Sequence, residues 1–163
     1  MIVLKPVSKE RIWGTPRLHQ YSGDSHIDRI GSVYSVSGIE ALSNEILAGD
    51  EHRTLYEAVK AAPEKFGITA GFDYPIIISF TSADENLSIQ VHPTDEYAIT
   101  HENALYGKSE SWYFIEPPSE GWIYADSLIE DKKEIKRSIL NGDYESVVGK
   151  RLVSKNDLVY IPS

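Results

Sequence analysis

Polar and apolar residues alternate along the stretch LSIQVH, residues 87–92, until a proline ends the pattern. Successive side chains of a strand point to opposite faces, so the alternation predicts a strand with one apolar and one polar face. The side chains expected to be buried are Leu87, Ile89 and Val91. The polar face would present Gln90 and His92 on the same side of the strand, and this pair needs an explanation.

Other apolar stretches predict further strands. The run YPIIISF at residues 74–80 is continuously apolar, which is typical of a strand buried on both faces. Shorter mixed stretches between turn residues predict strands at 32–38, 108–116 and 121–126. Residues 150–163 predict two more short strands, which residues 155–157 connect. One face of the stretch 108–116 is expected to carry Lys108, Glu110, Trp112 and Phe114. Trp112 and Trp122 are interpreted as packing residues rather than as a sugar platform.

Helical spacing occurs in other segments. Residues 54–62, TLYEAVKAA, begin with Thr-x-x-Glu, carry apolar side chains at helical spacing and precede a proline, so they predict a helix. The polar segment 94–107 is expected to be partly helical. Residues 127–149 predict two helices separated at Asn141-Gly142, because one apolar stripe precedes this turn and another follows it. The second stripe consists of Tyr144, Val147 and Val148. A mainly β chain with helical insertions is the resulting expectation.

Length and charge narrow the class of protein. A chain of 163 residues has the size of one domain. Asp and Glu number 25 against 16 Lys and Arg, and the net charge of -9 disfavours nucleic acid and anionic membranes as partners. Apolar runs are too short for a signal peptide core or a membrane span. We therefore expect a soluble, cytoplasmic protein.

The candidate chemistry is that of a metal site without sulfur ligands. The chain has no cysteine, so His, carboxylate or amide groups would have to hold any metal. Gln90 and His92 would leave their strand about 6–7 Å apart, close enough to converge on one ion. Glu110 shares a predicted face with Lys108, and pairing of the two strands would create an oxygen and nitrogen set that suits zinc. A Gln-x-His pair is also typical of solvated or hydrogen-bonded side chains, and spacing alone does not decide between these alternatives.

Four stretches, in order along nearly the whole chain, resemble the type I mannose-6-phosphate isomerases, which are zinc enzymes of the cupin superfamily. These stretches are ERIWGTPRL, YPIIISF, LSIQVHPTDEYA and YGKSESWYFIE. The combination of Q-V-H-P with G-K-S-E is the specific part of the resemblance. It implies a cupin-like β-sandwich or barrel of the double-stranded β-helix, jelly-roll type. It also implies one Zn²⁺ per chain, bound by Gln90, His92 and Glu110, with Lys108 as the catalytic residue.

The chain also departs from the family pattern. It ends at Pro162-Ser163, before the histidine that is the family's fourth zinc ligand and before a later arginine. Ser32 stands where the family usually has a glutamate, and Ser79 stands where it usually has a lysine. The expectation is therefore a single cupin-type domain over 1–163, incomplete at its C-terminus, or a divergent branch of the family. In either case we expect these residues alone to isomerise mannose 6-phosphate weakly or not at all.

The resemblance implies an enzyme, a mannose-6-phosphate isomerase. Such an enzyme interconverts mannose 6-phosphate and fructose 6-phosphate by moving a proton between C1 and C2, so the expected partner is a small sugar phosphate. A non-catalytic sugar-binding or regulatory cupin is an alternative, in which Ser32 and Ser79 mark lost chemistry. A structural domain without metal is a further alternative, with Gln90, His92 and Glu110 in a hydrogen-bonded network.

Overall fold

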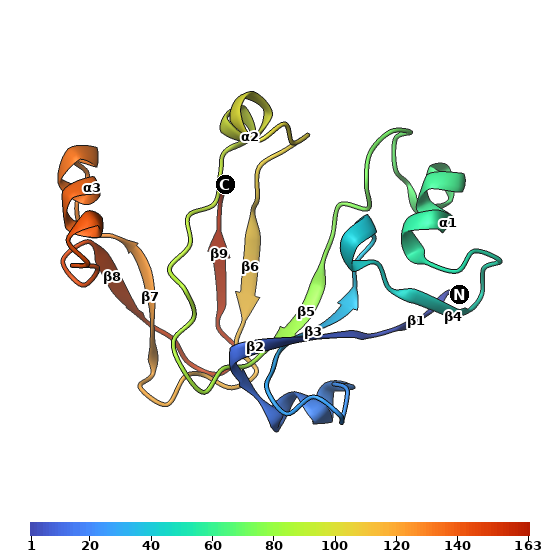
Figure 1. The fold of residues 1–163 in the computed structure, drawn as a ribbon, viewed down its shortest axis with the longest axis horizontal. Coiled ribbons are helices and arrows are strands. Elements are labelled where there is room, and N and C mark those ends of the chain that lie inside the picture. The colour runs from blue at the N-terminus through green and yellow to red at the C-terminus, as the bar shows by residue number, and fades with distance from the viewer. The chain divides into compact units, whose positions relative to one another are not determined.

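Antiparallel strand pairs make up most of the regular structure (Figure 1). The computed structural model describes all residues, 1–163, and the chain forms two compact units, Met1–Gln90 and Val91–Ser163. The helices in both units are short, and the prediction of a mainly β chain with helical insertions is confirmed. No helix has the length and apolar character that crossing a membrane requires. The assignment of the whole chain to one domain stays a prediction.

The first unit contains two small sheets. Its strands are β1 (Val3–Lys5), β2 (Val7–Thr15), β3 (Ile30–Val36), β4 (Glu45–Ala48) and β5 (Ile78–Thr81). β1 pairs with β4, and β3 lies between β2 and β5 in a three-stranded sheet. The core of this unit forms where Leu18 of the 3-10 helix η1 (Pro16–Tyr21) packs against Ile30 and Val33 of β3. The strand predicted at 32–38 is therefore confirmed, and it is the central strand of its sheet.

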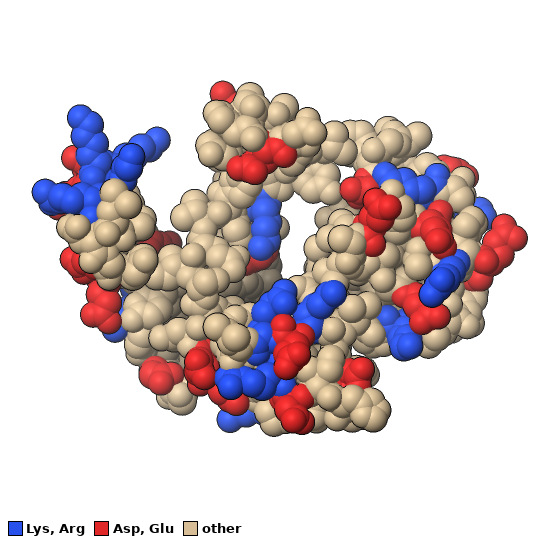
Figure 2. Space-filling view, viewed as in Figure 1, with Lys and Arg blue, Asp and Glu red and all other residues tan.

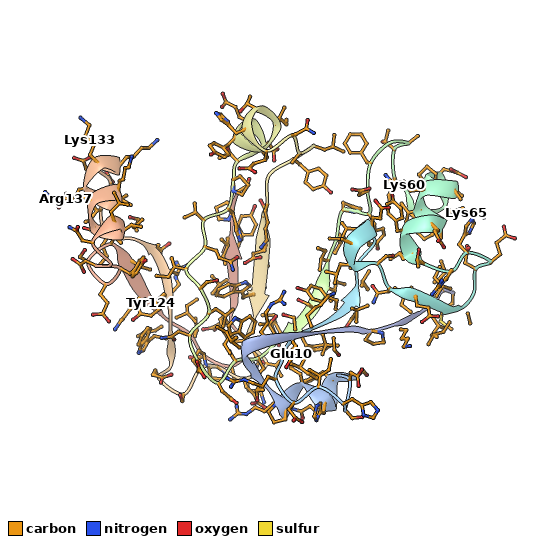
Figure 3. The ribbon with its side chains drawn as sticks, in the orientation of Figure 1. Glu10, Lys60, Lys65, Tyr124, Lys133 and Arg137 are labelled. Atoms are coloured by element: carbon orange, nitrogen blue, oxygen red, sulfur yellow. The ribbon has the colours of Figure 1, made fainter.

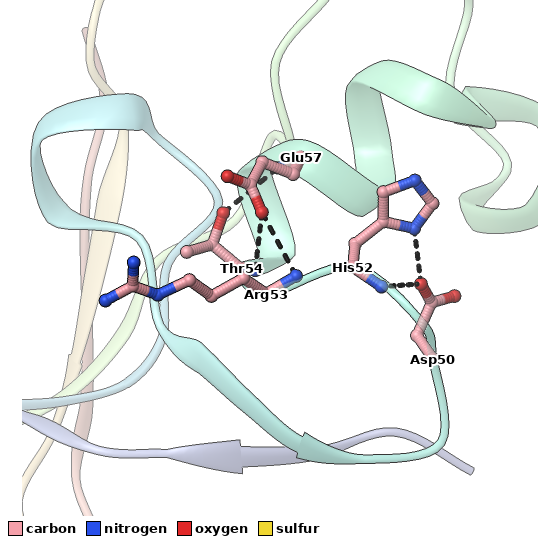
Figure 4. A network of polar contacts seen from close by, with 5 residues as sticks. All are labelled: Asp50, His52, Arg53, Thr54 and Glu57. Carbon is pink, nitrogen blue, oxygen red and sulfur yellow. Dashed lines mark hydrogen bonds and ion pairs between the residues drawn. The ribbon is translucent and has the colours of Figure 1, made fainter.

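Helix α1 (Leu55–Ala61) begins as its sequence predicts. The Thr54 hydroxyl accepts from the Glu57 backbone N–H, and the Glu57 carboxylate accepts from the backbone N–H groups of Arg53 and Thr54 (Figure 4). These bonds satisfy amide donors that have no partner inside the helix. The helix predicted at 54–62 is confirmed. Two other 3-10 helices complete this unit, η2 (Glu40–Leu42) and η3 (Pro63–Phe66).

One fully buried amide connects three segments of the first unit. The side-chain oxygen of Asn44 accepts from the backbone N–H of Ser37. Its Nδ2 donates to the carbonyls of Lys5 and Tyr34, both at 2.9 Å. A buried polar side chain is stable only when its hydrogen-bonding groups are satisfied, and here all three bonds go to the backbone. Asn44 therefore ties β1 and β3 to the short segment between η2 and β4.

The second unit contains two strand pairs and two helices. β6 (Glu110–Tyr113) pairs with β9 (Leu158–Ile161), and β7 (Trp122–Ser127) pairs with β8 (Val148–Leu152). The helices are α2 (Asp95–His101) and α3 (Lys132–Leu140). The strands predicted at 108–116 and 121–126 and the helix within 94–107 are confirmed with adjusted bounds. Basic side chains gather on α3, where Lys133 and Arg137 point away from the helix (Figures 2 and 3).

The strand predicted at 87–92 is wrong. This stretch has no regular strand structure, and the three aliphatic side chains expected to be buried are exposed, with Val91 at 91%. The alternation of residue types specifies which side chains would share a face, but burial also needs a paired strand and a covering layer. The stretch has no paired strand, and it crosses from the first unit into the second.

Two other expectations need correction. Only the end of the apolar run 74–80 enters a strand, and Ile76, Ile77 and Ile78 are about half exposed. β5 is an edge strand that pairs with β3 alone, whereas burial on both faces is typical of central strands. The second helix predicted within 127–149 is absent, because Val148 begins β8 and pairs with Ser127. Cross-strand pairing has overridden the local helical spacing in this stretch.

Candidate metal centre

Glu110, the first residue of β6, is the centre of a small polar cluster in the second unit. The indole Nε1–H of Trp112 donates to its Oε1 at 2.8 Å, and the Lys108 ammonium lies 3.1 Å from its Oε2. The Nε2 atom of His92 lies 3.6 Å from Oε1. The structure thus brings two of the predicted metal ligands together with the predicted catalytic lysine.

His92 is held almost entirely out of solvent. Its side chain is 10% exposed, and its Nδ1 atom is buried without a hydrogen-bond partner. Buried polar atoms normally find a partner, so an unpaired imidazole nitrogen needs an explanation, and a functional site is one such explanation. The other ring nitrogen faces the Glu110 carboxylate and is available as a ligand atom.

Strand pairing and a backbone clamp explain why His92 and Glu110 meet. Pairing of Glu110 with Ile161 fixes the start of β6. Just before it, the Lys108 backbone N–H donates to the Pro93 carbonyl at 3.2 Å, and the Gly107 N–H donates to the Asp95 carboxylate at 2.8 Å. These bonds hold Pro93, which follows His92, against Gly107 and Lys108, which precede Glu110.

The backbone at position 107 lies so close to Pro93 and Thr94 that only a glycine fits there. A Cβ atom built on Gly107 would lie 2.2 Å from the Pro93 carbonyl oxygen and 2.7 Å from the Thr94 carbonyl carbon. Both are backbone atoms, so they could not give way without moving the segment that carries His92. The glycine of the G-K-S-E stretch therefore has a steric role in assembling the cluster.

Gln90, the third predicted ligand, is the last residue of the first unit. It is exposed, and its side-chain amide donates to the Ser88 hydroxyl at 3.1 Å. This bond corresponds to the hydrogen-bonded alternative considered for the Gln-x-His pair. Participation of Gln90 in a metal centre with His92 and Glu110 stays a prediction.

The donor set of the cluster suits zinc. An imidazole nitrogen and a carboxylate oxygen are common zinc ligands, and two ligand atoms of a tetrahedral zinc site lie about 3.4 Å apart at bond lengths of about 2.0–2.2 Å. The separation of 3.6 Å between His92 Nε2 and Glu110 Oε1 is close to that value. No third His, Cys, Asp or Glu side chain joins them, so any further protein ligand would have to be of another kind, such as an amide.

The two positions that depart from the family pattern lie on neighbouring strands of the first unit. Ser32 of β3 pairs opposite Thr81 of β5, and Ser79 of β5 pairs opposite Tyr34 of β3. The Ser32 and Thr81 hydroxyl oxygens lie 3.3 Å apart. Because residues two apart on a strand share a face, these four side chains form one hydroxyl-bearing face.

Sequence reasoning assigned no role in the cluster to three of its residues: Trp112, Asp95 and Gly107. Trp112 could have been found, since it shares the alternating face of Lys108 and Glu110 and indole N–H groups seek acceptors when partly buried. The Asp95 to Gly107 bond spans a helix and a loop, and no local pattern indicates it.

The fold belongs to the cupin class of mainly β proteins, as predicted. The crystal structure of the mannose 6-phosphate isomerase from Bacillus subtilis matches 99% of this chain and 52% of that chain, with a TM-score of 0.90 and 29% sequence identity. No protein-family model matches the chain.

Curated relatives carry the same name. The chain is 34% identical to the probable mannose-6-phosphate isomerase GmuF and 32% identical to the mannose-6-phosphate isomerase ManA, both from Bacillus subtilis. It is 29% identical to the mannose-6-phosphate isomerase of Streptococcus mutans. Each match covers 99% of this chain and 52% of the relative, so the chain spans about half the length of the relatives it matches. The predicted resemblance to mannose-6-phosphate isomerases is confirmed.

Proposed function

We propose that this chain carries the metal centre of a zinc-dependent aldose-ketose isomerase, which interconverts mannose 6-phosphate and fructose 6-phosphate in the cytoplasm. The main support is the joining of His92, Glu110 and Lys108 in one cluster, in a chain that resembles named mannose-6-phosphate isomerases over 99% of its length. The substrate is a small sugar phosphate, and one Zn²⁺ is bound per chain.

His92 and Glu110, with Gln90 as the third protein ligand, are the groups that would hold the zinc ion. When bound, zinc supplies a Lewis acid that polarises the sugar oxygens at C1 and C2. His92 contributes a buried imidazole, whose Nε2 faces the carboxylate with which it would share the ion. Glu110 contributes negative charge, which favours a divalent cation over water at this position.

Lys108 is the residue proposed to handle protons or negative charge. Its side chain is about half exposed, and its ammonium group forms an ion pair with Glu110 Oε2 at 3.1 Å. Isomerisation moves a proton between C1 and C2 and develops negative charge on the sugar oxygens. A lysine beside the metal-binding carboxylate is well placed to stabilise that charge or to exchange the proton.

Metal content and turnover of matched variants test this function. We expect the purified chain to bind about one zinc per molecule and the His92→Ala and Glu110→Ala variants to lose it. Glu116→Ala is the control, because Glu116 is an exposed carboxylate close to the end of β6. Isomerase activity would be measured as the conversion of mannose 6-phosphate to fructose 6-phosphate. Any such activity should fall in proportion to the zinc content. Turnover that survives both His92→Ala and Glu110→Ala would refute the assignment.

The hydroxyl-bearing face of β3 and β5 favours a second candidate function, a cupin that binds sugar without converting it. Ser32 and Ser79 offer neutral hydroxyls where the resembled family usually has charged side chains. Binding of mannose 6-phosphate, measured by calorimetry in the presence of zinc, together with no turnover would favour this candidate. Turnover that depends on Glu110 would exclude it.

A further inference from the structure

Trp112 has a polar contact that a packing residue does not need. Its side chain is 37% exposed, and its indole N–H donates to Glu110 Oε1 at 2.8 Å. We infer that Trp112 is a positioning residue of the metal centre, which holds the Glu110 carboxylate in the orientation in which it binds zinc together with His92. This inference rests on the proposed function, since it concerns the same centre.

The position of Trp112 makes it suited to this task. It lies two residues after Glu110 on β6, so both side chains leave the same face of the strand. Its ring meets Phe114 edge to face, with 6.5 Å between the centroids and an interplanar angle of 76°. An indole has only two side-chain torsions, and this aromatic contact limits them further. The N–H group is therefore presented to Glu110 in a defined direction.

Glu110 needs such a partner because a glutamate side chain has several rotatable bonds. Trp112 holds one carboxylate oxygen and Lys108 faces the other, so the carboxylate is oriented from both sides. Lys108 is a flexible point charge and cannot define the carboxylate plane alone. The rigid indole supplies the directional hydrogen bond.

The hydrogen bond from Trp112 leaves room for the metal. An ionised carboxylate oxygen has two lone-pair sites. Oε1 accepts the indole N–H with one of them, and its other site remains available on the atom that His92 Nε2 approaches to 3.6 Å. Outer hydrogen bonds to metal-binding carboxylates typically change metal affinity by roughly 10–100-fold.

Trp112→Phe is the informative variant, because it keeps an aromatic ring beside Phe114 and removes the N–H donor. Zinc affinity of the full chain would be measured by competition with a chromophoric chelator. We expect Trp112→Phe to weaken zinc binding by roughly 10–100-fold. The matched control is Trp122→Phe on β7, whose ring contacts Lys150 in the same unit, and it should leave zinc affinity unchanged.

A double variant tests whether Trp112 acts through Glu110. If it does, Trp112→Phe should cause little further loss of zinc affinity in a Glu110→Asp background, because the shorter carboxylate keeps ligand oxygens but no longer reaches the indole N–H. A residue that only maintains packing would weaken zinc binding by the same factor in both backgrounds. Unchanged zinc affinity of Trp112→Phe would overturn the inference while the zinc centre stands. Absence of zinc binding by the wild-type chain would refute the proposed metal centre itself, and the inference with it.

Discussion

Replacing Gly107 by alanine changes none of the proposed metal ligands. It should still disturb the metal centre, because the added Cβ displaces the backbone next to His92. The new Cβ would lie 2.2 Å from the Pro93 carbonyl oxygen and 2.9 Å from the Asp95 nitrogen, and real Cβ contacts of this kind are not that short. The segment that follows His92 must therefore move away. This movement breaks or lengthens the bonds from Lys108 N–H to Pro93 and from Gly107 N–H to Asp95.

The magnitude follows from these contacts. Overpacking of a closed contact costs about 1–3 kcal/mol, and each of the two lost hydrogen bonds contributes about 0.5–1.5 kcal/mol, so the second unit should lose about 2–6 kcal/mol of stability. Because His92 precedes Pro93 directly, its imidazole should move away from Glu110. Zinc affinity is expected to fall at least about tenfold.

Denaturant unfolding and zinc titration of the same preparation test the prediction. Gly121→Ala serves as the matched control in the same unit. Gly121 has a φ of 71°, and nothing lies within 4 Å of a Cβ built there. This control should cost about 1–2 kcal/mol from backbone strain alone and leave zinc affinity unchanged. If Gly107→Ala matches the wild type in zinc affinity and stability, the close contact at Gly107 does not assemble the cluster.

Two further predictions concern the first unit. Asn44→Ala should lower the free energy of unfolding by about 3 kcal/mol or more, since three buried backbone groups lose their partner, and a loss below about 1 kcal/mol in urea unfolding would contradict this. Hydrogen bonds from the backbone and side chain of His52 lower the pKa of Asp50 below its usual 3.8. The depressed pKa adds stability that is complete above pH 3.8 and is lost as the pH falls further, so Asp50→Asn should flatten the acid limb of a pH-stability profile. Coinciding profiles of variant and wild type would disprove this role of Asp50.

Helix ends could be predicted from the sequence because their determinants are local. Thr54 and Glu57 form the capping box of α1 within four consecutive residues, as the Thr-x-x-Glu pattern indicates. The stop at Asn141-Gly142 ends α3 for a similar reason, since Gly142 adopts a φ of 73° that a glycine tolerates. Interactions of this range need no partner from elsewhere in the chain.

Strand burial could not be predicted in the same way. The apolar run 74–80 and the alternating stretch 87–92 both carry strand-like patterns, but the first lies at a sheet edge and the second has no strand partner. A pattern along one strand records which side chains share a face. Whether that face is covered depends on residues far along the chain, so burial is a property of the tertiary structure.

The candidate site also combines features that the sequence indicated with features that only the tertiary structure reveals. The stretches QVHP and GKSE, read as a resemblance, identified His92, Glu110 and Lys108 as candidates, and the alternation of β6 placed Glu110 and Trp112 on one face. Only the tertiary structure brought His92 to Glu110, through the contact of Gly107 with the backbone of Pro93 and through the pairing of β6 with β9. Bringing residues that are far apart in the sequence together costs conformational entropy. Contacts spread over the whole unit must offset this cost, so no single stretch of sequence shows whether two such residues will meet.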